Sequence, residues 1–299
     1  MAYTPPHEVR KQITKQGLYP SLEKVVNVAS VPQRSVFRYP GGKTWLIPHV
    51  RRWLMSKSPA PAYFVEPFAG GGIAGLTAAF EDLAKQIILT EIDENVAAVW
   101  RVILNGRASK LATKIETYEL TSDNIKSSLS ADNGNLLDLA FATILRNRVQ
   151  HGGIMAPGAG LMKFGENGKG VGSRWYAATL AKRIRDIAKV KDKITFNPED
   201  GFDTIKRYAR HKTAVFFVDP PYTVAGRRLY AHGVIDHEKL FSAMSKVTGD
   251  PLLTYDDSDE VRGWAKQYGF DCTTVAMKSR QHTGKKELLI GRNLGWARD

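Results

Sequence analysis

The chain has 299 residues, of which 43% are hydrophobic and 24% charged, so it can bury a sizeable core as one large domain or two smaller ones. Its formal net charge of +13 favours a polyanionic partner, nucleic acid before a membrane surface, over a basic protein without such a partner. The single cysteine, Cys272, excludes an internal disulfide framework and a Cys-x-x-Cys zinc site, and the seven histidines show no metal-ligand spacing.

The predicted elements begin after a polar extension. Residues 1–35 are interrupted by prolines, and we expect them either to wrap the domain or to be partly disordered. Short apolar strands then alternate with amphipathic helices, which is typical of an open α/β sheet. The predicted strands are 64–68, 87–91, 194–197, 214–219 and 252–255. The helices between them are 73–81, 94–103, 203–210, 236–247 and 259–268. A closing hairpin is predicted from 273–277 and 287–291.

The middle of the chain has a different character. A helix over 135–148 has no strand beside it, and a glycine-dense segment over 152–172 excludes regular helix. A basic helix over 174–188 follows, with Ser173 as its expected N-cap. Between residues 144 and 193 there are 11 Lys and Arg against 3 acidic residues, counted from the sequence. We therefore predict a main domain over 36–110 and 194–299, with a basic, mainly helical lobe over 111–193 inserted into it.

Asp219-Pro220-Pro221-Tyr222 directly follows a buried strand, where open α/β sheets place their ligands. A carboxylate and a proline-fixed backbone carbonyl can accept hydrogen bonds from both protons of an amino group, and a tyrosine offers a flat face to a base. The alternative is a turn that simply ends the strand, because Asp-Pro-Pro is common in loops.

Three further motifs lie earlier in the chain. Glu66-Pro67-Phe68-Ala69-Gly70-Gly71-Gly72 joins a strand to a helix, and its glycines allow close approach of a ligand. Glu91 ends the next strand, where an acid typically holds a ribose diol, although Asp93 is a rival for that position. Arg38-Tyr39-Pro40-Gly41-Gly42-Lys43 opens a helix expected from Thr44. Each motif alone also fits an ordinary turn or a solvated side chain.

Together, the four motifs resemble the alpha group of DNA adenine methyltransferases, the Dam-like family, over about residues 35–292. Arg38–Lys43 resembles the family's Trp-Ala-Gly-Gly-Lys element, with Tyr39 in the tryptophan position. Glu91-Ile92-Asp93 resembles its Asp-Ile-Asn strand end, and the Asp-Pro-Pro-Tyr tetrapeptide matches without change. The resemblance implies a Rossmann-like S-adenosylmethionine-dependent methyltransferase sheet, a helical DNA-recognition lobe containing a β-hairpin, double-stranded DNA as partner and a monomer.

The resemblance also implies roles for individual residues. Asp219 and the Pro220 carbonyl would accept hydrogen bonds from the N6 amino group of a flipped adenine, and Tyr222 would stack on the base. The residues expected to contact S-adenosylmethionine are Tyr39, Lys43, Glu66, Pro67, Phe68, Gly70, Gly72, Glu91 and Asp219. The residues expected to contact DNA are Arg38, Arg146, Arg148, Gln150, His151, Arg280 and Lys285. For any one of the arginines, a phosphate contact is at least as expected as base reading.

Several alternatives stay open on the sequence. An enzyme acting on RNA adenine or on cytosine N4 is the nearest rival, although those enzymes usually place asparagine or serine first in the tetrapeptide. A fold that only binds DNA is a second rival. Cys272 lacks a Pro-Cys context, which argues against cytosine carbon-5 chemistry. The start of the chain lacks an apolar signal core, and we expect a cytoplasmic protein of a bacterium or a phage-infected cell.

Overall fold

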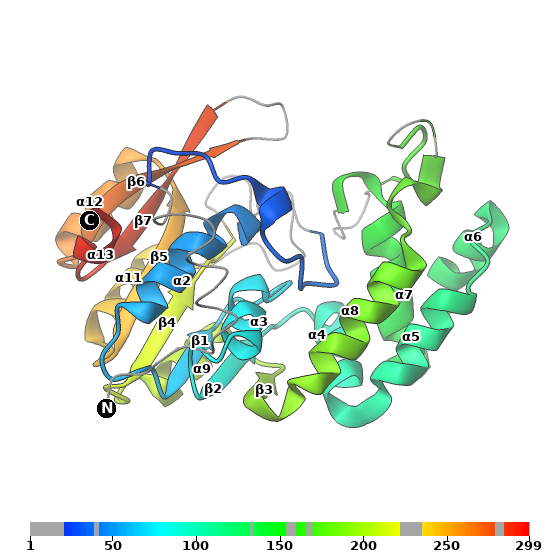
Figure 1. Cartoon of the computed structure of the whole chain (residues 1–299), viewed down its shortest axis with the longest axis horizontal. Helices are drawn as coiled ribbons and strands as arrows, with labels where there is room; N and C mark the ends of the chain where they lie inside the picture. Colours follow the sequence, from blue (N-terminus) through cyan, green and yellow to red (C-terminus); the bar gives the residue numbers. More distant parts are fainter. Residues whose placement is uncertain are drawn as a thin grey trace.

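The computed structural model describes residues 21–38, 42–131, 134–153, 160–165, 168, 170–221, 235–278 and 284–298. A seven-stranded sheet forms the centre of the molecule (Figure 1). Its strands are β1 (Tyr63–Glu66), β2 (Gln86–Thr90), β3 (Ile194–Asn197), β4 (Ala214–Val218), β5 (Asp250–Asp256), β6 (Asp271–Lys278) and β7 (Gly284–Gly291). The order across the sheet is β3-β2-β1-β4-β5-β7-β6. β1 to β5 pair in parallel, and β7 runs antiparallel to both of its neighbours.

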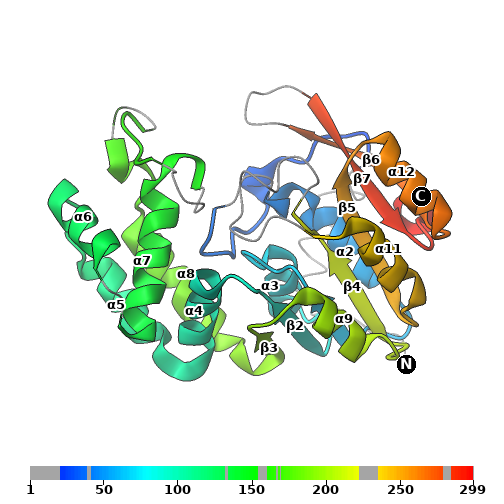
Figure 2. The same cartoon turned by 180° about the vertical axis from the view of Figure 1, so that it is seen from behind.

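Helices cover both faces of the sheet, and alternate strand residues pack against opposite layers. On β4, every residue is buried; Phe217 belongs to one core cluster and Phe216 to the other. The first layer is α2 (Ile47–Met55), α3 (Ile73–Phe80), α4 (Glu94–Val102) and the short α13 (Gly295–Arg298). The second layer, seen from behind in Figure 2, is α9 (Gly201–Tyr208), α11 (His237–Lys246) and α12 (Asp259–Gln267). The α/β fold with a Rossmann-like sheet, predicted from the sequence, is confirmed.

A group of helices lies beside the sheet in both views (Figures 1 and 2). They are α5 (Ala108–Thr117), α6 (Ser122–Ser130), α7 (Leu136–Val149) and α8 (Ala177–Lys189), which we call the helical lobe. Its buried residues belong to the same hydrophobic cluster as the first helix layer, so the lobe and the sheet share one core. A small antiparallel bridge joins Gln150 to Leu161 at its tip, with Met162 N–H donating to the Val149 carbonyl at 2.9 Å.

The strand predictions are confirmed to within a few residues, but three details elsewhere in the chain differ. The expected boundary between residues 110 and 111 falls inside α5, because the chain leaves α4 through a wide turn in which Gly106 takes a φ of +81°. Ser173 is not an N-cap: it lies in a 3-10 turn, and α8 starts after Tyr176. The helix expected from Thr44 begins as a 3-10 turn and becomes α2 at Ile47.

The end of the N-terminal extension packs on the main domain. Leu22, Val26 and Val31 are buried in the main core, and the Leu22 carbonyl accepts a hydrogen bond from the Ala276 N–H of β6 at 2.7 Å. Residues 21–35 therefore wrap the domain, which was one of the two expectations, whereas residues 1–20 lie outside the described part. Among the described residues, no helix combines the length and apolar character needed to cross a membrane.

Candidate active site

The carboxyl ends of three neighbouring parallel strands bring together the acids singled out in the sequence. β1 ends at Glu66, β2 is followed by Glu91, and β4 is followed by Asp219. β1 pairs with both β2 and β4, so these ends share one edge of the sheet. The carboxyl of Asp219 is near enough to Glu66 to raise the pKa of Glu66 further. This edge is the place where an open α/β sheet binds its ligand.

Glu66 ends β1, and its buried side chain lies against the first turn of α3. Its side chain is 3% exposed, and Oε2 accepts a hydrogen bond from the Gly75 N–H at 2.8 Å. A Cβ on residue 75 would lie 2.7 Å from that oxygen, so a larger residue there would displace the carboxyl from its present position. Burial raises the pKa of Glu66 to about 8; Asp219 adds to the rise, and the Gly75 N–H opposes it. The free protein therefore holds a neutral or easily protonated carboxyl at this position near pH 7.

Glu91 fixes the glycine turn that follows β1. Its Oε2 accepts from the Gly70 N–H at 2.9 Å, and its Oε1 accepts from the Asp93 N–H at 2.9 Å. Burial raises the pKa of Glu91, while these backbone donors lower it. The indole N–H of Trp100 donates to the Gly70 carbonyl at 2.9 Å, so Gly70 is bound on both sides. The rival acid Asp93 instead caps α4.

Trp100 also packs closely against Gly72, the last glycine of this turn. Gly72 has a φ of +58°, and a Cβ there would approach the Trp100 ring to 2.8 Å. Pro67 is buried and Phe68 is half-buried beside it, with the Phe68 ring edge-on to Phe202 of α9. The glycines were found from the sequence, but Trp100 was not, because it reads there as one apolar position of a helix. Ile92, next to Glu91, is 46% exposed at this edge.

Asp219 is held by a buried cation and a hydroxyl. The Lys43 ammonium lies 2.9 Å from Asp219 Oδ1, and the Thr254 hydroxyl donates to the same oxygen at 2.8 Å. The Lys43 side chain is 3% exposed, whereas that of Asp219 is 24% exposed. Lys43 also lies 3.5 Å from Oε2 of Glu287 on β7, a carboxylate that is only 5% exposed. Lys43 was expected to contact the cofactor. In the structure its ammonium lies between the carboxylates of Asp219 and Glu287.

A tyrosine completes the floor of this region. Tyr255 on β5 is buried, and its hydroxyl lies 2.9 Å from Nδ1 of His237. Burial raises the pKa of Tyr255, and the nearby Asp219 raises it further, so the hydroxyl stays protonated. Pro220 is buried beside Asp219. Thr254, Tyr255 and Glu287 carry no motif in the sequence and were missed. Tyr39 and Tyr222, which the sequence analysis assigned to the cofactor and the base, lie outside the described residues.

Of the residues expected to contact DNA, Arg148 lies inside the described structure and not on its surface. Arg148 is 3% exposed and donates to the Val36 carbonyl; burial first, and neighbouring arginines second, lower its pKa to about 9. This side chain therefore supports the fold from inside, and the expectation of a surface contact at Arg148 is corrected. Arg38, Arg146 and Gln150 are half-buried, and His151 is exposed. Arg280 lies outside the described residues, and for Lys285 only the backbone, paired with Met277 in the hairpin, is described.

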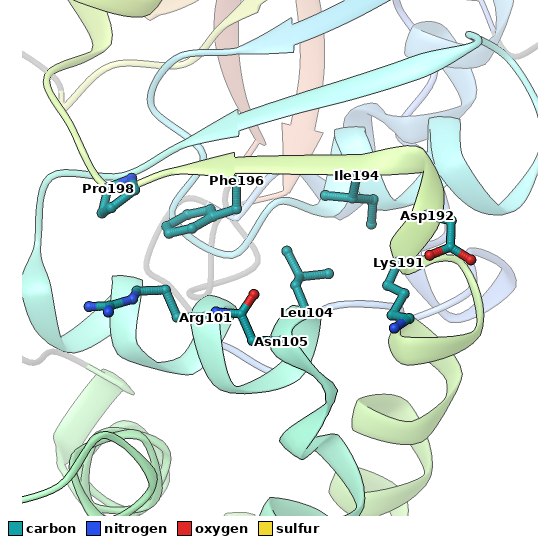
Figure 3. Close-up of a pocket in the computed structure, with 8 residues that line it drawn as sticks. All are labelled: Arg101, Leu104, Asn105, Lys191, Asp192, Ile194, Phe196 and Pro198. Carbon is teal, nitrogen blue, oxygen red and sulfur yellow. The ribbon is translucent and has the colours of Figure 1, made fainter.

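A cavity of about 290 Å³ lies away from these acids (Figure 3). Phe196, Ile194 and Leu104 form its apolar wall, and Arg101 lies at one end of it (Figure 3). The cavity borders β3, the edge strand, which β2 and β1 separate from β4. None of the residues proposed for chemistry lines it. Among the described residues, no group of three or more His, Cys, Asp or Glu is placed to hold a metal ion.

Comparison with known proteins supports the resemblance in the first part of the chain. Residues 39–130 match the model of a family described as D12 class N6 adenine-specific DNA methyltransferase. This match confirms the resemblance to the Dam-like adenine methyltransferase family for that part, and it points to S-adenosylmethionine as the cofactor. A search of curated proteins found no match.

Solved structures match this chain only at low similarity. A proposed RNA methyltransferase from Pyrococcus horikoshii is 9% identical with a TM-score of 0.40, over 95% of this chain and 96% of its own. Spermidine synthase from Thermotoga maritima is 11% identical with a TM-score of 0.37, over 84% of this chain and 59% of its own. A precorrin decarboxylase from Methanobacterium thermoautotrophicum is 12% identical with a TM-score of 0.34, over 92% of this chain and 100% of its own. These values carry no conclusion about substrate.

Proposed function

We propose that this chain is a DNA adenine methyltransferase that transfers the methyl group of S-adenosylmethionine to N6 of an adenine flipped out of duplex DNA. The observation that carries the proposal is Asp219, held by Lys43 and Thr254 at the edge of the sheet where Glu66 and Glu91 also lie. The family match over residues 39–130 supports the same reaction.

The described residues fit the proposed cofactor. Glu66 offers a buried carboxyl suited to an ammonium group, and Glu91 offers a second carboxyl suited to a ribose diol. Gly70 and Gly72 leave backbone between them without side chains, and Trp100 fixes its shape. When bound, S-adenosylmethionine supplies a methyl group on a positively charged sulfur. The acids on this edge supply the opposite charge.

The proposed chemistry requires Asp219 and Pro220 to make a poor nucleophile reactive. The lone pair of an adenine amino group is delocalised into the ring. Two acceptors, the Asp219 carboxylate and the Pro220 carbonyl, would bind the two amino protons and favour a tetrahedral nitrogen. The nitrogen would take the methyl group as the carbon–sulfur bond breaks, and the former sulfonium would leave as a neutral thioether. The proton that the nitrogen gives up would pass to the Asp219 carboxylate, whose 24% exposure allows release to water. Cys272 lies on β6, which β7 and β5 separate from β4, so no cysteine adduct is part of the scheme.

Exposed aromatic and basic residues on the helical lobe support a nucleic-acid substrate. Phe164 is 82% exposed and Tyr176 is 53% exposed, which is unusual for side chains of this size. Lys163 precedes Phe164, and aromatic faces next to cations are suited to bases and phosphates. We propose that this side of the lobe contacts DNA, together with His151 and the half-buried Arg38 and Arg146.

The substrate class is tested by labelling. The protein should be incubated with methyl-labelled S-adenosylmethionine and with duplex DNA, RNA or neither, and the products digested to nucleosides. We expect label in duplex DNA as N6-methyladenine. Label in RNA alone, or on cytosine, would overturn the DNA adenine assignment. No label in any nucleic acid, with intact cofactor binding, would favour a fold that only binds. Modification calls on methylated genomic DNA would then give the target sequence.

Glu66 predicts how cofactor affinity depends on pH. Its pKa of about 8 means that the free carboxyl is largely protonated below pH 8, whereas binding an ammonium favours the carboxylate. Affinity should therefore rise with pH up to about pH 8, by roughly tenfold per unit at most for a single proton. Calorimetric titrations at several pH values, in buffers of different ionisation enthalpy, would show this proton release. Glu66→Gln should bind more weakly at pH 8 and lose the dependence. An identical pH profile in both proteins would contradict the role.

A further inference from the structure

Asn147, a side chain that the proposed reaction does not use, binds two separate segments of the chain. It lies on α7 and is 1% exposed. Its Oδ1 accepts from the Arg38 N–H at 2.9 Å, and its Nδ2 donates to the Arg38 carbonyl at 3.0 Å. The same Nδ2 donates to the Gly153 carbonyl at 2.9 Å. One buried amide thus holds both backbone groups of Arg38 and one of Gly153.

Two arginines of the lobe bind the same segment. Arg148 donates to the Val36 carbonyl, and Arg183 of α8 donates to the Ser35 carbonyl at 3.1 Å. Asn147 differs from both arginines because its acceptor and donor match a single residue in a paired, strand-like manner. The arginines fasten the segment to the lobe, and Asn147 sets its register.

Gly153 also makes close contact with the same carbonyl. It has a φ of +75°, and a Cβ there would lie 2.3 Å from the Arg38 oxygen. That distance is a direct clash with backbone, which has no rotamer by which to move away. Gly153 is therefore required both for its conformation and for its lack of a side chain. Two independent features, one hydrogen-bonding and one steric, fix the Arg38 carbonyl.

Each bound segment leads to a different part of the proposed site. Five residues after Arg38 the chain reaches Lys43, whose ammonium binds Asp219 at 2.9 Å. His151 and Gly153 belong to the small paired element at the tip of the lobe, where the His151 N–H donates to the Gly160 carbonyl at 3.0 Å. The amide of Asn147 thus lies between the chain that enters the active site and the element proposed to meet DNA.

We infer that Asn147 is a positioning residue: it holds the Arg38 backbone in register with the His151–Gly153 element, so that cofactor and target are presented to each other. Its hydrogen bonds to Arg38 fix the backbone at a point five residues before Lys43. Its bond to Gly153 fixes where the lobe tip begins. The DNA half of this inference rests on the proposed function, whereas the cofactor half does not.

Asn147→Ala tests the cofactor half without any nucleic acid. Without the hydrogen bonds from Asn147, the Arg38 backbone loses its fixed position five residues before Lys43. We therefore expect the dissociation constant for S-adenosylmethionine to rise about tenfold or more. Amide exchange at Arg38 should quicken while exchange in the centre of α7 stays slow. Thr143→Val is the matched control: Thr143 is fully buried one turn earlier on α7, and its hydroxyl donates to the Leu139 carbonyl of the same helix at 2.7 Å. Its cofactor affinity should stay within about twofold of wild type.

Gly153→Ala displaces the Arg38 carbonyl in another way, because the added Cβ clashes with it. This variant tests the inference even if Asn147→Ala does not fold. It should weaken cofactor binding in the same direction, and the double variant should be less than additive because both changes displace one group. Calorimetry well below the melting temperature of each variant gives the result. Unchanged cofactor affinity and unchanged exchange at Arg38 in a folded variant would overturn the inference, even if its melting temperature fell. A wild-type protein that binds cofactor but methylates no DNA would refute the proposed function alone.

Discussion

Replacing Asp219 with alanine should abolish methyl transfer while DNA binding is retained. The change removes the carboxylate proposed to accept an amino hydrogen bond, and a loss of at least about a thousandfold in rate is expected for an acceptor used mainly in the transition state. The fold should survive, because the buried ammonium of Lys43 keeps Glu287 at 3.5 Å as a partner. The rate is measured by transfer of labelled methyl to duplex DNA, and DNA affinity is measured separately.

Asp219→Asn is the matched control for shape. It keeps the size of the side chain and an oxygen able to accept from Thr254, but it removes the charge that binds Lys43. We expect it to be less active than wild type but more active than Asp219→Ala, because the amide oxygen can still accept a hydrogen bond from the amino group. Near-normal methylation by the folded alanine variant would show that the assigned chemistry is wrong.

Replacing Lys43 with methionine should cost both stability and activity. The ammonium is buried between Asp219 and Glu287, and its removal leaves two carboxylates close together with their shared cation gone. Breaking a buried ion pair by removing one partner typically costs about 3–5 kcal/mol, because an uncompensated charge stays buried. Chemical denaturation should show this loss in the free energy of unfolding, and methyl transfer should fall with it.

A second substitution separates the two effects of Lys43. Lys43→Met combined with Glu287→Gln removes the more deeply buried of the two remaining charges. We expect the double variant to recover much of the lost stability but little of the activity, because Asp219 still lacks its cation. Recovery of full activity together with stability would show that Lys43 only compensates charge. A single Lys43→Met variant as stable as wild type would contradict the buried network itself.

The sequence predicted well where the strands lie along the chain, because those positions depend on local patterns. Ala214–Val218 is apolar throughout and is followed by Asp-Pro-Pro, so both the strand and the position of Asp219 at its end could be predicted. The glycine turn after Glu66 followed from the same reasoning. These features depend on neighbours in the chain, and the structure places them within a few residues of the expected bounds.

The partners of these residues could not be predicted, because they come from distant parts of the chain. Glu287 reads in sequence as one polar position of a closing strand, yet pairing of β7 with β5 brings it to Lys43. Arg148 reads as a cation leaving a helix toward DNA, whereas packing against Val36 buries it. Asn147 lies between two arginines in the sequence and was not predicted to have a role. Its position on the buried side of α7 follows only from tertiary packing.

The position of β7 also has a consequence for synthesis. Among the described strands β7 is made last, yet it lies inside the sheet, between β5 and β6. A growing chain that has been synthesised only as far as β6 leaves the edge of β5 unpaired. It also lacks Glu287, so Lys43 has only one of the two carboxylates that surround it in the complete fold. The nascent protein therefore already has Glu66, Glu91 and Asp219 at the ends of β1, β2 and β4. It does not yet have the second carboxylate beside Lys43, so the charges around Lys43 and Asp219 are not balanced as in the complete fold. Insertion of the last of the described strands therefore completes both the sheet and the charge balance around Lys43.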